Sequence, residues 1–234
     1  MRSLVALLLL ACSTTPAPRP AAPPRAAGGD EWTSTFTVAA DDWTATGRNP
    51  WFSLMPGDQS TFEGGDTRLV ITVLDETRTV DGVQTRVIEE REWDEGQLEE
   101  VSRNFFALSK RTNGVYYFGE EVDIYDDGQL SRHEGAWLSG EHGAHFGLLM
   151  PGEPLLGSRY AQEIAPDVAM DRAEVVGLAE TLTTPAGKFT GCLKTEETSP
   201  LEPKSREHKL YAAGVGLIQD GEVVLLKVGR AEGK

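Results

Sequence analysis

The sequence contains very few cysteines. Only Cys12 and Cys192 occur in its 234 residues. Because Cys12 lies where a short N-terminal apolar run ends, we expect it to be chemically modified, which leaves Cys192 without a partner in the chain. The sequence therefore predicts a fold that is held by its own hydrophobic core and not by disulfides. Cys192 lies in a stretch typical of a strand, and we predict that it is a small buried side chain and not a nucleophile.

Histidines and basic residues are scarce as well. Four histidines leave few general bases, and the sequence has neither a Gly-x-Ser-x-Gly motif nor a glycine-rich phosphate loop. We therefore predict no catalytic residues and no cofactor. The 22 Lys and Arg residues against 37 Asp and Glu residues give a net charge of −15. Such a surface repels phosphate backbones, which argues against nucleic acid as a partner.

The N-terminus has the pattern of an export signal. Arg2 precedes the apolar run Leu4–Ala11, which is far shorter than the roughly 20 residues that span a bilayer. The stretch Leu9-Leu10-Ala11-Cys12 resembles the bacterial lipobox. This resemblance implies that residues 1–11 are a signal peptide and that Cys12 carries acyl chains, such as palmitate, that anchor the protein to a membrane of the cell envelope. An ordinary signal peptide is the alternative. In the lipobox family, Ser13 after the cysteine implies the outer membrane, with the periplasm beside it, and not the inner membrane.

A tether is predicted between this anchor and the folded domain. Residues 12–29 contain five prolines among alanines and end in two glycines, with almost nothing to bury. Proline-rich segments favour an extended conformation of ~3.1 Å per residue, so the tether could reach about 50 Å. We assign residues 30–234 to a single domain with its core at about 49–228.

Strand patterns dominate the rest of the chain. Alternating β-branched and aromatic residues, as in 69–74 and 115–118, are separated by hairpin turn signals such as Asp81-Gly82 and Asp127-Gly128. We predict an all-β fold with one antiparallel, strongly curved sheet that forms a half-barrel or a barrel, with a sandwich as the alternative. The best helix candidate is the short segment 41–46. The segment 166–179 could be helical, but its valines favour a strand.

Several motifs resemble an uncharacterised group of exported bacterial proteins and lipoproteins. They are Asn49-Pro50-Trp51-Phe52-Ser53-Leu54-Met55-Pro56-Gly57, Val115-Tyr116-Tyr117-Phe118-Gly119, Met150-Pro151-Gly152-Glu153-Pro154, Thr184-Pro185-Ala186-Gly187-Lys188-Phe189 and Leu210-Tyr211-Ala212-Ala213-Gly214-Val215-Gly216-Leu217. The last two motifs are also similar to those of envelope β-proteins with the half-barrel of lipoprotein carriers. The resemblance implies the fold class and the location, and it implies no catalytic residue.

Two functions remain open at this point. The first is a non-enzymatic domain that binds an apolar ligand or an envelope protein, with aromatic candidates Trp51, Phe52, Tyr116, Tyr117, Phe118 and Trp137. The second is a secreted hydrolase that uses carboxylates near the glycine-rich segment 135–157, which we expect to be a long loop between two halves of the sheet. An apolar cavity would favour binding, and convergent carboxylates beside a histidine would favour catalysis.

Metal binding has one weak candidate pair, His142 and His145. These histidines are three residues apart in a glycine-containing loop and lack the helical spacing that directs two imidazoles to one ion. We therefore predict no metal site. The adjacent acids Glu120 and Glu121 are predicted to point to opposite faces of a strand, which argues against their acting as a catalytic pair.

Overall fold

The computed structural model describes residues 31–231. The predicted signal peptide, the predicted lipidation site Cys12 and the whole of the predicted tether lie outside these residues. Within them, no helix is long and apolar enough to cross a membrane. Strands make up 64% of the described residues, which confirms the all-β prediction.

Most of the strands belong to one large antiparallel sheet. The first part of this sheet contains β4 (Asp58–Gly64), β5 (Thr67–Val80), β6 (Val83–Asp94), β7 (Gln97–Ser109), β8 (Val115–Asp126), β9 (Gln129–His133), β10 (Trp137–Leu138) and β11 (His145–Met150). The second part contains β12 (Arg159–Ala161), β13 (Glu163–Ile164), β14 (Arg172–Thr184), β15 (Gly187–Thr198), β16 (Glu207–Ala212), β17 (Gly216–Asp220) and β18 (Val223–Arg230). Short elements precede them: η1 (Ala40–Asp42), β1 (Trp43–Thr44), β2 (Arg48–Asn49) and β3 (Phe52–Ser53).

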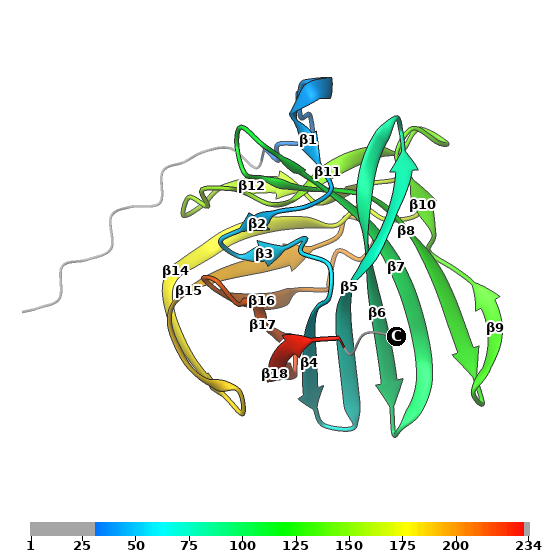
Figure 1. Cartoon of the computed structure of the whole chain (residues 1–234), viewed down its shortest axis with the longest axis vertical. Helices are drawn as coiled ribbons and strands as arrows, with labels where there is room; N and C mark the ends of the chain where they lie inside the picture. Colours follow the sequence, from blue (N-terminus) through cyan, green and yellow to red (C-terminus); the bar gives the residue numbers. More distant parts are fainter. Residues whose placement is uncertain (1–30, 232–234) are drawn as a thin grey trace, which may run out of the picture. The chain divides into compact units, whose positions relative to one another are not determined.

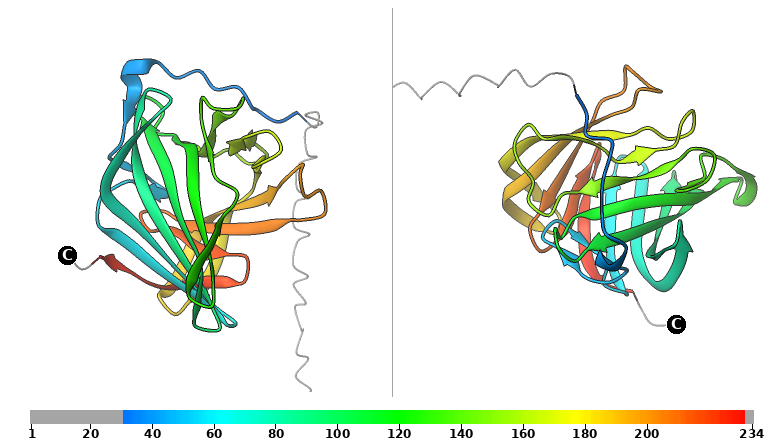
Figure 2. Two further views of the ribbon diagram at one scale, coloured as in Figure 1. Left: turned by 90° about the vertical axis from the view of Figure 1, so that its right-hand side faces the viewer. Right: turned by 90° about the horizontal axis from the view of Figure 1, so that it is seen from above.

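The sheet curves until it is nearly closed into a barrel. Its order is β12-β14-β15-β16-β17-β18-β4-β5-β6-β7-β8-β11-β13, so the last strand, β18, pairs with β4 (Figure 1). The strands β4–β8 form one curved wall and β14–β18 form another (Figure 2). The predicted strongly curved single sheet is therefore confirmed, and the sandwich alternative is not what forms.

Tight turns set the register of two of the hairpins. Asp81 and Gly82 both have positive φ, at 49° and 75°, between β5 and β6. Asp127 and Gly128 have φ of 50° and 73° between β8 and β9. These values are what a two-residue hairpin turn requires, because its backbone must follow the right-handed twist of the strands. The two Asp-Gly pairs are thus hairpin turns, as predicted.

The segment 41–46 is not the short helix that we expected. It forms one 3₁₀ turn and then the strand β1, which pairs with the end of β7. The buried Asp42 carboxylate accepts hydrogen bonds from the Ser109 hydroxyl at 2.6 Å and the Arg111 amide at 2.9 Å. A side chain that caps the β7–β8 turn in this way ties the segment to the sheet, and this tertiary contact outweighs its weak helix propensity.

The buried side chains form clusters on both faces of the curved sheet. On the outer face, Trp43 packs edge-on against Tyr116, Phe118 and Phe146 at centroid distances of 5.2 to 5.6 Å. Cys192 on β15 is fully buried with Phe62 and Ile218, which confirms its predicted place in the core. The inner face is partly filled by side chains and partly hollow.

The glycine-rich segment 135–157 is more ordered than the long loop that we expected. It contributes β10 and β11, and both strands pair with β8. A Cβ atom at Gly147 would lie 2.2 Å from the Gln162 carbonyl oxygen, so only glycine allows this close approach to the next segment. The segment lies between the two walls in the sequence, and its strand β11 also pairs with β13.

Candidate functional site

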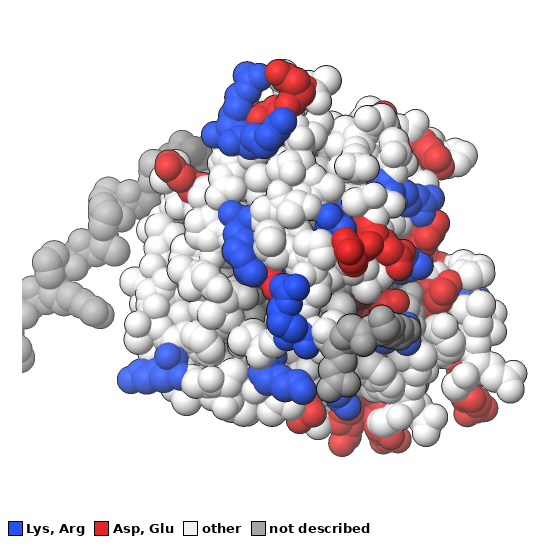
Figure 3. Space-filling view, in the orientation of Figure 1, with Lys and Arg blue, Asp and Glu red and all other residues white. Residues whose placement is uncertain are grey.

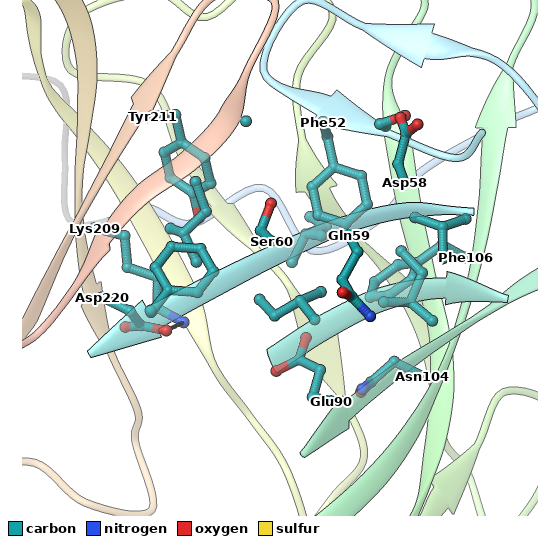
Figure 4. A pocket seen from close by; sticks show the side chains of 18 of the residues that line it. Phe52, Asp58, Gln59, Ser60, Glu90, Asn104, Phe106, Lys209, Tyr211 and Asp220 are labelled. Atoms are coloured by element: carbon teal, nitrogen blue, oxygen red, sulfur yellow. Dashed lines mark hydrogen bonds and ion pairs between the residues drawn. The ribbon is translucent and has the colours of Figure 1, made fainter. Parts of the chain in front are cut away.

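The interior of the barrel contains a cavity of about 580 Å³. Ligand sites in proteins commonly have volumes of about 300–1,000 Å³, so this space suits a small organic molecule. Side chains from both walls line it, including Glu90 and Phe106 from one wall and Lys209 and Tyr211 from the other (Figure 4). The alternation of side chains along each strand places them on the inner face.

One region of the cavity is apolar. Its lining includes Phe52, Ile71, Val73, Ile88, Phe106, Leu149 and Leu217. The ring of Phe52 packs edge-on against Phe106 with centroids 5.3 Å apart, and Phe106 stacks on Tyr117 at 4.6 Å. The Tyr117 hydroxyl donates to the Asn104 side chain, whose amide in turn donates to the Ser102 hydroxyl at 3.0 Å. This buried network fixes the wall on which an apolar group could rest.

The β2–β3 hairpin carries Phe52 to the cavity. Its Asn49 side chain is buried and donates to the carbonyl oxygens of Asn113 at 2.7 Å and Pro151 at 3.0 Å. On the other side, the Gly214 amide donates to the Pro50 carbonyl at 2.7 Å. The turn of the hairpin is therefore held by loops that are far apart in sequence.

Basic side chains surround Asp58 at this side of the cavity. The Asp58 carboxylate lies 2.7 Å from Arg48 and 2.8 Å from Arg230, and it accepts a hydrogen bond from the Ser53 hydroxyl at 2.6 Å. Lys and Arg residues run across the middle of the face on which β2, β3 and β18 lie (Figure 3). On this side the positive charges of the two arginines are partly neutralised by one carboxylate.

A second region of the cavity is strongly acidic. Its carboxyl groups are those of Glu90, Glu100, Glu120, Glu163, Asp171, Glu197 and Asp220, and Lys209 is the one basic residue among them. The Lys209 ammonium lies 3.2 Å from Asp220 (Figure 4) and 3.4 Å from Glu197. Burial alone would lower the pKa of Lys209, but these two carboxylates hold it well above its usual value. Lys209 is therefore charged and already shared between two acids.

Glu90 and Glu163 receive no comparable support. Among residues 31–231, neither side chain makes a hydrogen bond or an ion pair within 4 Å. The pKa of Glu90 is raised to about 7, mainly by burial, with Asp220, Glu120 and Glu100 adding to the rise and Lys209 opposing it. Burial, followed by Glu120 and Asp171, raises the pKa of Glu163 well above its usual range. Glu120 is also brought to about 7, mainly by burial.

A smaller cavity of about 290 Å³ adjoins the acidic region. It shares Glu163, Asp171, Glu197 and Lys209 with the large cavity. Its other lining residues include Glu202 and Glu207 near the loop between β15 and β16. The acidic region therefore extends towards the surface between this loop and the segment that follows β13.

The structure distributes the predicted aromatic candidates over different environments. Phe52 and Tyr117 line the large cavity, and Trp51 lies beside it in the same hairpin as Phe52. Tyr116 and Phe118 point to the outer face, where Trp43 covers them. Trp137 packs in the core against Tyr117 at 5.4 Å. These six residues therefore do not form one surface.

The two histidines considered for metal binding lie outside the cavity. His142 is exposed and has a positive φ of 49°, and His145 is exposed on β11. Over residues 31–231, no group of three His, Cys, Asp or Glu side chains is placed to hold a metal ion. The segment 135–157 contributes only Leu149 to the lining of the large cavity.

The acidic lining is the feature that sequence reasoning missed. Glu90 lies two residues from Ile88 on the same inner face of β6, but the sequence around it, Glu89-Glu90-Arg91-Glu92, is typical of a solvent-exposed strand. The one signal in the sequence for an inward-facing Glu90 was its spacing of two from Ile88, which faces the core. Comparison with protein-family models, with curated proteins and with solved structures found no match. The function must therefore be argued from the cavity itself.

Proposed function

We propose that this protein is a non-enzymatic binding protein of the bacterial cell envelope that takes a small, partly apolar molecule into its barrel. The observation that carries the proposal is the cavity of about 580 Å³ with an aromatic and aliphatic wall beside a cluster of polar groups. Apolar walls with a few polar groups are typical of ligand sites. A barrel of this kind can hold a ligand because its inner side chains leave space that the sheet itself does not fill.

The location is a proposal from the sequence. The lipobox-like stretch that ends at Cys12 supports an acylated N-terminus, with Ser13 favouring the outer membrane. Two or three acyl chains anchor a protein stably because each buried methylene contributes about 0.8 kcal/mol. The proline-rich segment after Cys12 would then keep the barrel at a distance from the bilayer and its cavity accessible. An envelope protein that hands over the ligand is a further partner consistent with this arrangement.

Hydrolysis is less well supported by the same carboxyl groups. A glycosidase needs one carboxyl that is protonated and another that is ionised. Here burial raises the pKa of both Glu90 and Glu120 to about 7, so their environments do not separate two roles. The lining residues of the cavity also include no histidine that could act as a general base. These observations favour binding over catalysis.

A binding experiment tests the proposal directly. The probe is N-phenyl-1-naphthylamine, a neutral dye that fluoresces in apolar sites, and the protein is the full chain with Cys12→Ser so that no acyl chain competes. We expect saturable binding, lost in Ile71→Trp, which fills the cavity, and kept in the neighbouring outward-facing Val70→Trp. Absence of binding, or equal binding by the two tryptophan variants, would contradict the proposal.

The anchor has its own test. Metabolic labelling with a fatty-acid analogue should tag the wild-type chain and leave Cys12→Ser unlabelled. Label that persists after this substitution would contradict lipidation at Cys12, and it would not affect the proposal that the barrel binds a ligand. Cys192→Ser is the matched control. Its thiol is buried in β15 and should accept no label, so this variant should be labelled like the wild type.

A further inference from the structure

The carboxyl groups in the acidic region greatly outnumber the cations there. Seven carboxyl groups line it, and Lys209 is the one basic residue among them. Lys209 is occupied by Glu197 and Asp220 at 3.4 and 3.2 Å. Glu197 also accepts hydrogen bonds from Gln162 at 3.1 Å and Thr195 at 3.2 Å, so its charge is satisfied. Glu90 and Glu163 lack such partners among the described residues, as noted above.

Unpaired carboxyl groups in a protein interior are costly. An ionised carboxylate away from water needs an opposite charge or several hydrogen-bond donors. Glu90 lies between Ile71 of β5 and Ser102 of β7 in the sheet register. Among the described residues it has no hydrogen-bond donor and no cation within 4 Å, and Lys209 acts on it only from a longer distance. A partner that comes from outside the chain would remove this cost.

We propose that the ligand is an amphiphile whose head is a protonated amine, with the ammonium among Glu90, Glu120 and Glu163 and the apolar tail against Phe52, Phe106 and Ile88. This inference deepens the proposed function and rests on it. Both kinds of surface belong to one cavity, so a single molecule can contact both. An ammonium group can donate three hydrogen bonds, which suits a cavity that is lined by several carboxyl groups.

Two further observations favour an organic cation. The same cavity has an aromatic and aliphatic wall, which suits the apolar tail of an organic molecule. In addition, the smaller cavity leads from Glu163 and Asp171 past Glu202 and Glu207, so the approach to the acidic region is itself acidic. A negative approach attracts cations and repels anions.

The protonation of the cavity links this binding to pH. The charged groups that face Glu90 are Lys209, Asp220, Glu120 and Glu100, and all except Lys209 are acids that raise its pKa. An ammonium ligand favours the ionised form, so it lowers the pKa of the carboxyl and releases a proton on binding. The preference for the amine should therefore decrease as the pH falls from about 8 to about 5.

The test compares three ligands that differ only in the head: octylammonium, octanol and octanoate. Each displaces N-phenyl-1-naphthylamine from the full chain carrying Cys12→Ser. At about pH 8 we expect octylammonium to displace the dye at a concentration about tenfold lower than octanol, with octanoate the weakest. The double variant Glu90→Gln, Glu163→Gln should bind octylammonium and octanol alike, and Glu89→Gln on the outer face should behave like the wild type.

The outcomes separate this inference from the proposed function. Equal displacement by the three ligands would overturn the amine assignment and leave the binding function in place. Preference for octanoate would also overturn it and would make Lys209 the anchor for the head. Failure of N-phenyl-1-naphthylamine to bind would contradict both the amine assignment and the proposed binding function. Retention of octanol binding by the double variant shows that it is folded, so loss of the amine preference cannot be ascribed to unfolding.

Discussion

Two charged residues on the inner face of β6 have opposite surroundings. The guanidinium of Arg86, which is 6% exposed, donates to the carbonyl oxygens of Ala45 at 2.9 Å, Glu76 at 3.1 Å and Leu74 at 3.3 Å, and to the Thr46 hydroxyl at 2.8 Å. Glu90, four residues later on the same face, has no hydrogen-bond partner for its side chain among the described residues. Ile88 separates the two on this face of the strand.

The difference distinguishes a charge that stabilises the fold from a charge that is available to a ligand. Arg86 joins the N-terminal segment to the irregular part of β5 after Val73, where the register with β6 shifts. The hydrogen-bond acceptors of its guanidinium are all supplied by the protein itself. The carboxyl of Glu90 faces the cavity and has no hydrogen-bond or ion-pair partner among the described residues. The following predictions test this distinction, beginning with the largest expected effect.

Removal of the Arg86 guanidinium should be the most damaging change. Arg86→Met leaves three backbone carbonyl oxygens without a donor, and we expect the free energy of unfolding to fall by about 3–5 kcal/mol. Urea denaturation of the variant measures this. Arg91→Met on the outer face, where the arginine pairs with Glu89 near solvent, should cost less than about 1 kcal/mol. Similar losses in the two variants would contradict the structural role of Arg86.

Removal of the Lys209 ammonium should have the next largest effect. Lys209→Met leaves Glu197 and Asp220 without their cation, and because the pair is partly accessible we expect a loss of about 2–3 kcal/mol. Thermal melts of the variant and the wild type provide the measurement, and a loss below about 1 kcal/mol would count against the charge pairing.

Glu90→Gln should increase stability at alkaline pH. The pKa of Glu90 is raised from 4.5 to about 7 in the folded protein, so the folded state binds more protons than the unfolded state between these values. Stability contributed by the protonated carboxyl is therefore lost as the pH rises through this window. We expect the variant to gain about 1–3 kcal/mol at about pH 8 and almost nothing at about pH 4.5. Glu89→Gln is the control, and a gain at both pH values would show that burial of the charge is not the cause.

The smallest effect is expected at the apolar side of the cavity. Phe52→Leu removes the edge-on contact with Phe106 and part of the apolar wall, at a cost of about 1 kcal/mol. The affinity for N-phenyl-1-naphthylamine should fall several-fold, while the preference for octylammonium over octanol should remain. Dye displacement on the variant measures both quantities. Loss of the head-group preference would show that the two regions of the cavity do not act separately.

Much of the fold could be predicted because local chemistry determines it. The Asp-Gly pairs at 81–82 and 127–128 require positive φ in tight hairpins, and the β-branched runs between such turns can only be strands. The short segment 41–46 could not be predicted, because its conformation depends on Asp42 reaching the β7–β8 turn some 67 residues away in sequence. Local pattern carries no information about such a contact.

The candidate site was harder to predict for the same reason. Phe52 and Tyr117 were among the predicted aromatic residues and do line the cavity. Glu90, Glu120 and Glu163 were not, because an acidic residue on a strand is usually solvated and nothing in the sequence places these three together. Only the closure of the sheet brings β6, β8 and β13 around one space.

The pairing of β4 with β18 has a consequence for how the barrel assembles. It brings Arg230 to Asp58 across a sequence separation of 172 residues, whereas β5 to β8 are joined by short local turns (Figure 1). Contacts of such long range form slowly, because the entropy cost of closing a large loop comes before the contacts contribute any stabilisation. We therefore expect the meander β5–β8 to fold before β18 pairs with β4, and the interior to become enclosed only after that pairing. Ligand uptake would then be the last property to appear during refolding.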